Sequence, residues 1–234
     1  MNIFDSSILS LLNQFARHWY VLDSAMVFVA AQDLPKGGVI VAALWGIWFN
    51  HHRDQRRNQS ILISSVAAGA IAILAARLAV LVLPFRVRPL YDPDLHFQHP
   101  FNVESIQLEN WSSFPSDHAT LFFALAVGIF LCCKRMGVLT LLYVFFVISF
   151  PRVYLGFHYP TDVIVGALMG STLAYLFATP RVRTIIEWLP MQWIDTYPRS
   201  FYACFFLVSW QMAQLFGSPL FHTLRTFLHF APSR

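Results

Sequence analysis

Three short polar segments stand between apolar stretches of this chain, and each carries side chains that can bind an anion or transfer a proton. They are PFRVRP at 84–89, FPSDHAT at 114–120 and PRVYLGFHYPTD at 151–162. Arginine presents a planar fork of N–H donors that suits phosphate oxygens, and histidine can act as nucleophile, acid or base near neutral pH. The segments therefore predict a phosphoryl-transfer site, provided that the fold brings them together.

A further arginine joins these candidates. Arg77 interrupts the clearest apolar run, and an arginine within a membrane usually faces a polar cavity or a partner. The predicted site residues are Arg77, Arg86, Arg88, Ser116, Asp117, His118, Arg152, His158 and Asp162.

Some of these residues also have purely structural interpretations. Ser116 and Asp117 are common N-cap residues before a helix. His158 and Asp162 could form a structural hydrogen bond. Other histidines, in the polar loop YDPDLHFQHP, are expected to be solvated, although a metal role is an alternative; we expect that the site needs no metal and no cofactor.

The composition predicts an integral membrane protein. Of the 234 residues, 57% are hydrophobic and only 12% are charged, and the mean hydropathy is +0.55, whereas soluble domains contain about 25% charged residues. Apolar stretches recur along the whole chain, so we expect one membrane domain over 1–234 with its catalytic core at about 60–178. The net charge of +4 is spread between the apolar runs, so nucleic acid is not an expected partner.

Two common sequence features are not indicated. Cys132, Cys133 and Cys204 are odd in number and lie in or beside apolar runs, which suggests neither a disulfide framework nor a zinc site. Asp5 and Arg17 interrupt the N-terminal apolar segment, so we expect no cleaved signal peptide.

Apolar runs predict an all-α transmembrane bundle of about six spans, each of which needs about 20 residues. The first run is partly amphipathic, and the second follows Pro35. Seven candidate runs, of which the first and the last are the weakest, cover residues 8–31, 37–50, 60–83, 118–133, 136–150, 160–178 and 201–217.

Basic residues predict the orientation of the bundle, because cytoplasmic connections are rich in Lys and Arg. The loops 84–117 and 151–159 then lie together on the opposite, non-cytoplasmic face, since a two-helix hairpin separates them. All three polar segments would thus meet at one face. The basic clusters comprise Arg53, Arg56 and Arg57, then Lys134 and Arg135, and finally Arg181 and Arg183.

In order and spacing, the polar segments resemble the signature of the type-2 phosphatidic acid phosphatase superfamily of membrane lipid phosphatases. That signature has a lysine, six residues and Arg-Pro; then Pro-Ser-x-His; then Ser-Arg, five residues, His, three residues and Asp. Leu81 stands in place of the lysine, and Pro151 in place of the serine. The matching positions run from Leu81 to Arg88-Pro89, from Pro115 to His118, and from Pro151-Arg152 through His158 to Asp162.

The resemblance implies a role for each polar group in the reaction. His158 would attack phosphorus and carry the phosphoryl group, while Asp162 holds its imidazole in the reactive tautomer. Pro160 favours the start of a helix, which would place His158 just before the helix and Asp162 in its first turn. His118 would protonate the leaving oxygen and then activate water.

The resemblance also implies a set of phosphate-binding groups: Arg88, Arg152, Ser116 and the backbone N–H groups near Asp117. Two residues compete to replace the missing lysine. Arg77 lies one helical turn before Leu81 on the same face, and Arg86 lies in the loop that follows. Arg77 could also simply pair with an acidic residue.

Within this superfamily the chain is similar to the bacterial undecaprenyl pyrophosphate phosphatases associated with bacitracin resistance. The similarity lies in VLDSAMVFVA at 21–30, in SFPSDHAT and in the missing lysine. It implies hydrolysis of undecaprenyl pyrophosphate to undecaprenyl phosphate, a step of peptidoglycan biosynthesis, at the non-cytoplasmic face of the bacterial inner membrane. The expected partners are a phosphorylated lipid and the bilayer.

Alternatives remain open at this point. The substrate could be phosphatidate, phosphatidylglycerophosphate or a lipid A-type phosphate, and a non-enzymatic lipid-binding protein could retain the same fold. The vanadium haloperoxidases share the catalytic segments, but they are soluble, and this composition excludes that setting.

Overall fold

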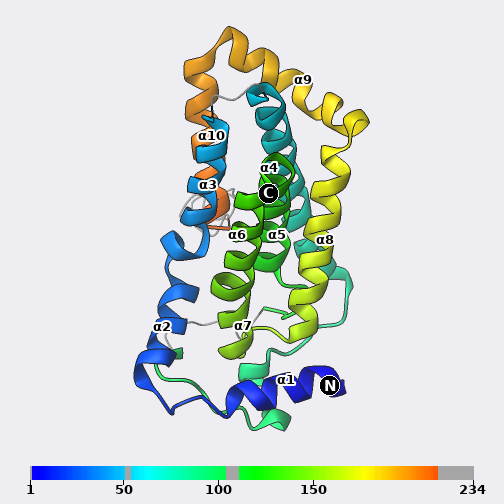
Figure 1. Ribbon diagram of the computed structural model, residues 1–234. Helices are drawn as coiled ribbons and strands as arrows, with labels where there is room; N and C mark the ends of the chain where they lie inside the picture. Colours follow the sequence, from blue (N-terminus) through cyan, green and yellow to red (C-terminus); the bar gives the residue numbers. More distant parts are fainter. Residues whose placement is uncertain (1, 51–53, 104–110, 216–234) are drawn as a thin grey trace, which may run out of the picture.

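The computed structural model describes residues 2–50, 54–103 and 111–215, and this part of the chain is a bundle of helices joined by loops (Figure 1). The predicted all-α membrane bundle is confirmed. Helix α5 (Asp117–Cys132) lies at the centre, where it packs between α4 (Gln55–Val82) and α8 (Pro160–Ala178). Helix α3 (Val39–Trp48) and α6 (Lys134–Tyr143) also pack against α5.

Three helical stretches in the described part of the chain are long and apolar enough to cross a bilayer. They are α4, α8 and the run Lys134–Tyr154, in which π-helical η5 (Val144–Ser149) joins α6 to α7 (Phe150–Tyr154). A fourth span results if α2 (Tyr20–Ala31) is taken together with Leu34–Trp48, which comprises π-helical η1 (Leu34–Gly38) and α3; the two parts are bent by 65° at the break between them. By length and composition, the described residues thus contain three or four candidate spans, fewer than the about six expected from apolar runs, and α5 is an apolar helix of only 16 residues.

The N-terminal run 8–31 differs from its prediction. It forms two helices, α1 (Ile3–Asn13) and α2 (Tyr20–Ala31), instead of one. Arg17 between them has φ of +62°, a left-handed conformation that ends a helix. The bundle therefore gains a short helix at its end, and α1 packs there against α7 and α8.

The C-terminal region holds a helix that the apolar runs did not predict. Amphipathic α9 (Pro180–Thr196) crosses one end of the bundle and leads into α10 (Pro198–Ala213) (Figure 1). Helix α10 corresponds to the predicted run 201–217, whose last two residues lie outside the described part, as does Arg53.

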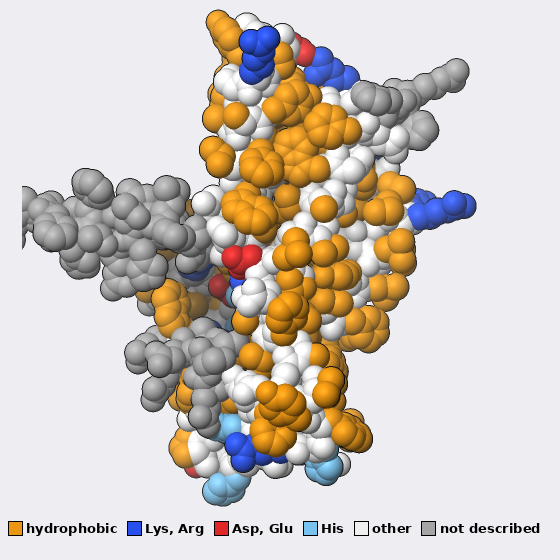
Figure 2. Space-filling view, turned by 90° about the vertical axis from the view of Figure 1, so that its left-hand side faces the viewer, with side chains coloured by type: hydrophobic (Ala, Val, Ile, Leu, Met, Phe, Trp, Pro, Cys, Tyr) orange, Lys and Arg blue, Asp and Glu red, His pale blue; other side chains and the backbone are white. Residues whose placement is uncertain are grey.

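The surface of the bundle suits a bilayer. Figure 2 shows a face with hydrophobic side chains along its whole length; Lys and Arg side chains lie at its top and bottom and also project from its right-hand side. The starts of α5 and α8 lie toward the end at which α1 lies, and α9 crosses the opposite end (Figure 1). The polar segments therefore share one end of the bundle, and the basic connection at Lys134 belongs to the other.

Close packing of α5 on α8 sets the distance between the polar segments at that end. A Cβ on Gly166 would lie 2.6 Å from the carbonyl oxygen of Ser116, and one on Gly170 would lie 1.9 Å from that of Thr120. Small residues allow such backbone contact between membrane helices. As a result the backbone N–H of Ser116 donates to the carbonyl of Asp162 at 3.2 Å, which joins the first turns of α5 and α8.

Replacement of Gly170 by alanine tests this packing. Its methyl group must push α8 away from Thr120, so we expect Gly170→Ala to lower the free energy of unfolding by about 1–3 kcal/mol. Gly46→Ala is the matched control, because a Cβ at Gly46 meets nothing within 4 Å. Unfolding of both variants in a detergent titration gives the comparison, and equal stability would contradict the packing.

Candidate active site

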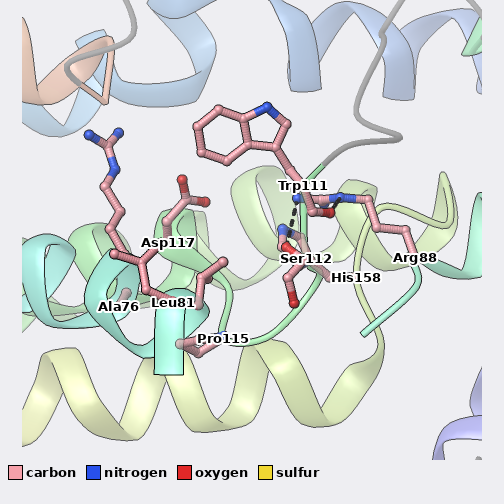
Figure 3. A pocket seen from close by; sticks show the side chains of 10 residues that line it. Ala76, Leu81, Arg88, Trp111, Ser112, Pro115, Asp117 and His158 are labelled. Atoms are coloured by element: carbon pink, nitrogen blue, oxygen red, sulfur yellow. Dashed lines mark hydrogen bonds between the residues drawn. The ribbon is translucent and has the colours of Figure 1, made fainter. Parts of the chain in front are cut away.

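A cavity of about 240 Å³ lies between the C-terminal part of α4, the first turn of α5 and the loops on either side of them. It brings together groups from all three polar segments, namely Arg88, Asp117 and His158. Figure 3 shows Asp117 and Leu81 on one side of it and Ser112, His158 and Arg88 on the other. The lining residues are Ala76, Arg77, Val80, Leu81, Arg88, Trp111, Ser112, Pro115, Asp117 and His158.

His158 precedes α8 and is only 2% exposed. Its Nδ1 lies 2.7 Å from the carbonyl oxygen of Ser113. A carbonyl only accepts hydrogen bonds, so Nδ1 carries the proton and Nε2 keeps its lone pair. Burial lowers the pKa of this imidazole, against the opposite effect of Asp162, so the ring is neutral at neutral pH. His158 therefore has the tautomer and charge of a nucleophile.

Asp162 is fully buried in the first turn of α8 and supports His158 from a greater distance. Its Oδ2 accepts a hydrogen bond from the backbone N–H of Tyr159 at 2.8 Å and lies 3.8 Å from Nδ1 of His158. Its Oδ1 accepts from Arg86. Asp162 was expected to hold the His158 imidazole. At this distance it acts on the ring mainly by its charge, and the carbonyl of Ser113 accepts the direct hydrogen bond.

Asp117 and His118 form a pair at the start of α5. Oδ1 of Asp117 lies 2.8 Å from Nδ1 of His118 and accepts from the backbone N–H of His118 at the same distance. Asp117 lines the cavity, whereas His118 lies beside it with a side chain that is 16% exposed. The Asp117 carboxylate thus orients the His118 imidazole, and the binding of phosphate by backbone N–H groups near Asp117 stays a prediction.

Arg88 ties the loops of the cavity together. Its Nε, Nη1 and Nη2 donate to the carbonyl oxygens of Trp111, Phe157 and Ser112 at 2.9, 2.6 and 3.2 Å. Burial lowers the pKa of this guanidinium, but the value starts so high that the group stays charged. Arg88 therefore fixes the two residues next to His158 and Ser113 while it presents positive charge to the cavity.

The remaining predicted phosphate donors, Arg152 and Ser116, are not among the residues that line the cavity. Arg152 in α7 is buried; its Nη2 donates to the carbonyl of Ala30 at 3.4 Å, and its Nε has no hydrogen-bond partner among the described residues. Such an N–H group is available to donate a hydrogen bond to a phosphoryl oxygen. Ser116 is the N-cap of α5, and its hydroxyl accepts from the N–H of Ala119, so its role in this structure is to start the helix.

The two candidates for the missing lysine occupy different places. Arg77 lines the cavity, and its Nη2 donates to the carbonyl of Leu215 at 2.7 Å. Arg86 does not line the cavity, because its guanidinium is held by Asp5 and Asp162. The geometry therefore favours Arg77 as the replacement for the signature lysine, whose place in this chain is taken by Leu81.

Sequence reasoning missed several groups that shape the site. Ser112, Ser113 and Trp111 act through backbone carbonyls, which leave no signal in residue type. Asp5 did leave a signal, because an acidic residue in an apolar segment usually has a buried partner.

The loop histidines take no part in the cavity. His99 Nε2 lies 3.1 Å from the carbonyl of Leu90, and His96 follows η3 (Pro93–Leu95) with φ of +44°. Within residues 2–50, 54–103 and 111–215, no group of three or more His, Cys, Asp or Glu is placed to hold a metal ion.

Comparison with known proteins identifies the family. The PAP2 superfamily matches residues 61–184, which include all three polar segments. The chain belongs to this superfamily. The predicted family and the predicted enzyme class, a phosphatase that hydrolyses phosphoric esters or diphosphates, are confirmed.

Three named proteins are similar to this chain in sequence. The chain is 25% identical to undecaprenyl-diphosphatase BcrC of Bacillus subtilis over 73% of its own length and 80% of the relative. It is 30% identical to an undecaprenyl-diphosphatase of Sulfolobus acidocaldarius, over 66% of this chain and 68% of that relative. The bacitracin transport permease protein BcrC of Bacillus licheniformis is 40% identical over 37% of this chain and 43% of that protein. No solved structure gives a significant match.

Substitution of Arg88 tests its bracing role. A lysine has one ammonium and cannot reach three carbonyls in different directions, so we expect Arg88→Lys to lower phosphatase turnover by roughly a hundredfold through misplacement of the loops. Arg56→Lys is the control, since Arg56 forms an exposed ion pair with Asp195 at the other end of the bundle. Turnover per folded molecule is the measurement, and similar values for the two variants would refute the role.

Proposed function

We propose that this membrane phosphatase hydrolyses undecaprenyl diphosphate to undecaprenyl phosphate through a phosphohistidine on His158. One observation carries the proposal: a buried, neutral His158 with its Nδ1 bound to Ser113 faces a cavity that also contains Arg77 and Arg88. The names of the relatives from Bacillus subtilis and Sulfolobus acidocaldarius support the lipid diphosphate as substrate. We further propose that the cavity faces the outside of the inner membrane, because basic connections gather at the opposite end of the bundle.

In the first step, Nε2 of His158 attacks the terminal phosphorus of the diphosphate. The bond from phosphorus to the bridging oxygen breaks, and His118, which enters this step as an imidazolium with a proton on each ring nitrogen, donates its Nε2 proton to the lipid phosphate that leaves. The negative charge of the bound diphosphate raises the pKa of His118, which burial and Arg152 lower in the protein alone. Asp117 keeps Nδ1 of His118 as a hydrogen-bond donor, so Nε2 of that ring is the atom that transfers the proton. The ring of His118 must turn toward the cavity for this step, and catalytic contacts often close only in the substrate complex.

In the second step, water attacks the phosphohistidine and His118 accepts its proton. Inorganic phosphate leaves, and His158 regains the lone pair on Nε2. The Asp162 carboxylate stabilises the positive charge that the His158 ring carries whenever its bond to phosphorus is partly formed. Throughout both steps, Arg77, Arg88 and the unpartnered Nε of Arg152 supply the positive charge that phosphoryl oxygens require.

Phosphate release from purified protein tests the proposal. We expect undecaprenyl diphosphate to yield phosphate in the presence of EDTA, and His158→Ala to reduce the rate on the order of a thousandfold or more. His99→Ala is the matched control, since His99 lies outside the cavity and should leave the rate unchanged. Full activity of His158→Ala, or no activity on any lipid diphosphate, would overturn the proposal.

Arg77 provides a second test within the same assay. Removal of a guanidinium that contacts phosphate should lower turnover roughly a hundredfold in Arg77→Leu, and Arg77→Lys should recover only part of it. The double variant Arg77→Leu/Leu81→Lys should recover much of the activity, since it restores a cation one helical turn away. Arg135→Leu, at the exposed start of α6, is the control. Unchanged turnover in Arg77→Leu would show that Arg77 only pairs with the backbone of Leu215.

A further inference from the structure

Asp5 is a buried acidic residue outside the region that matches the PAP2 superfamily. It lies in α1 and is 0% exposed, yet it contacts the first turn of α8 directly. Its Oδ1 accepts from the backbone N–H of Thr161 at 2.9 Å, and its Oδ2 accepts from the hydroxyl of Thr161 at 2.7 Å. The N-terminal helix is thus fastened to the residue next to Asp162.

Arg86 connects Asp5 to Asp162. Its Nη2 donates to Oδ2 of Asp5 at 2.7 Å, and its Nη1 donates to Oδ1 of Asp162 and to the hydroxyl of Thr161. The guanidinium also lies over the ring of Tyr159, 3.9 Å from the ring centre, which fixes its plane. Two buried carboxylates therefore share one guanidinium.

This sharing has an electrostatic consequence for His158. A single cation between two carboxylates leaves one negative charge in excess, so Asp162 is not neutralised by its partner. Asp162 lies 3.8 Å from Nδ1 of His158 and is the nearest acidic group to it among the described residues. The other charged groups that act on His158 are Arg88, from the loop before η2 (Pro89–Tyr91), and Asp117, from α5.

We propose that Asp5 is a positioning residue of the phosphatase site: it holds Arg86 between two carboxylates and so preserves the negative charge of Asp162 that supports His158. This inference rests on the proposed phosphohistidine mechanism. Without Asp5, Arg86 pairs with Asp162 alone, and the positive charge that develops on His158 loses its counter-charge.

Asp23 offers a matched control within the same chain. It is also 0% exposed, and it accepts hydrogen bonds from the backbone N–H groups of Arg17 and Phe101 and from the hydroxyl of Tyr154. It is therefore a buried carboxylate with a similar number of donors. No described contact joins it to Arg86 or Asp162, so its loss should affect stability without changing the charge at His158.

The experiment compares Asp5→Asn with Asp23→Asn on the purified full-length protein. Initial rates on undecaprenyl diphosphate per folded molecule are measured across the acid range of pH. They give the maximal rate and the acid limb, which is the part of the pH profile where the rate falls as the pH decreases. We expect Asp5→Asn to be slower by on the order of tenfold, with its acid limb displaced to lower pH by about half a unit, because a less negative surrounding disfavours the protonated imidazole. Asp23→Asn should keep the limb of the wild type. Substrate ionisation is common to all variants, so a difference in the limb belongs to the protein.

A double variant covers the case in which Asp5→Asn does not fold. Asp5→Asn/Arg86→Gln removes one carboxylate together with the shared cation and leaves Asp162 with its charge. We expect its acid limb to match the wild type, whereas the acid limb of Arg86→Gln, which leaves two carboxylates without their shared cation, should lie at higher pH. An unshifted limb in Asp5→Asn, or a double variant whose limb coincides with that of Arg86→Gln, would overturn the inference. An inactive wild type, or a fully active His158→Ala, would instead refute the mechanism on which it rests.

Discussion

The hydrogen bond from Nδ1 of His158 to the carbonyl of Ser113 is the interaction on which the site depends. It selects the tautomer that leaves Nε2 free, and it holds a buried ring in one orientation. The carbonyl can do this because its own residue is fixed: the N–H of Ser113 donates to the carbonyl of Arg86 at 2.9 Å, and Arg88 holds the neighbouring Ser112. Both arginines thus hold the proposed nucleophile in place through backbone groups, and Arg88 also presents its charge to the cavity.

Charge buried at the end of an apolar bundle must be paired, and the pairing explains much of the architecture there. Asp5, Arg86 and Asp162 form a closed network, and the carbonyls around Arg88 satisfy that guanidinium. A buried ion pair gains little net stability but becomes costly when one partner is lost. The short helix α1 and the close packing of α8 on α5 are therefore parts of the site, because they keep these groups in contact.

The sequence predicted the features that depend on residue type and spacing. Apolar runs gave the all-α bundle, and the positions of Arg88, Asp117 and His158 correctly pointed to one common cavity. Three features escaped prediction for physical reasons. The break at Arg17 depends on a local left-handed turn, the amphipathic α9 lacks a continuous apolar run, and Ser113 acts through its carbonyl, which every residue possesses. The choice between Arg77 and Arg86 also required coordinates, since both are arginines near position 81.

The proposed role of His158 can be tested by locating the phosphoryl group on a trapped intermediate. Protein mixed with undecaprenyl diphosphate labelled on its terminal phosphate can be quenched within one turnover in alkali, which preserves phosphohistidine, and then digested for mass spectrometry and NMR. Because Nδ1 of His158 is occupied by Ser113, we expect a single phosphorylated residue, His158, with phosphorus on Nε2. Phosphorus on Nδ1 of His158, on His118, or on no residue of the protein would contradict it.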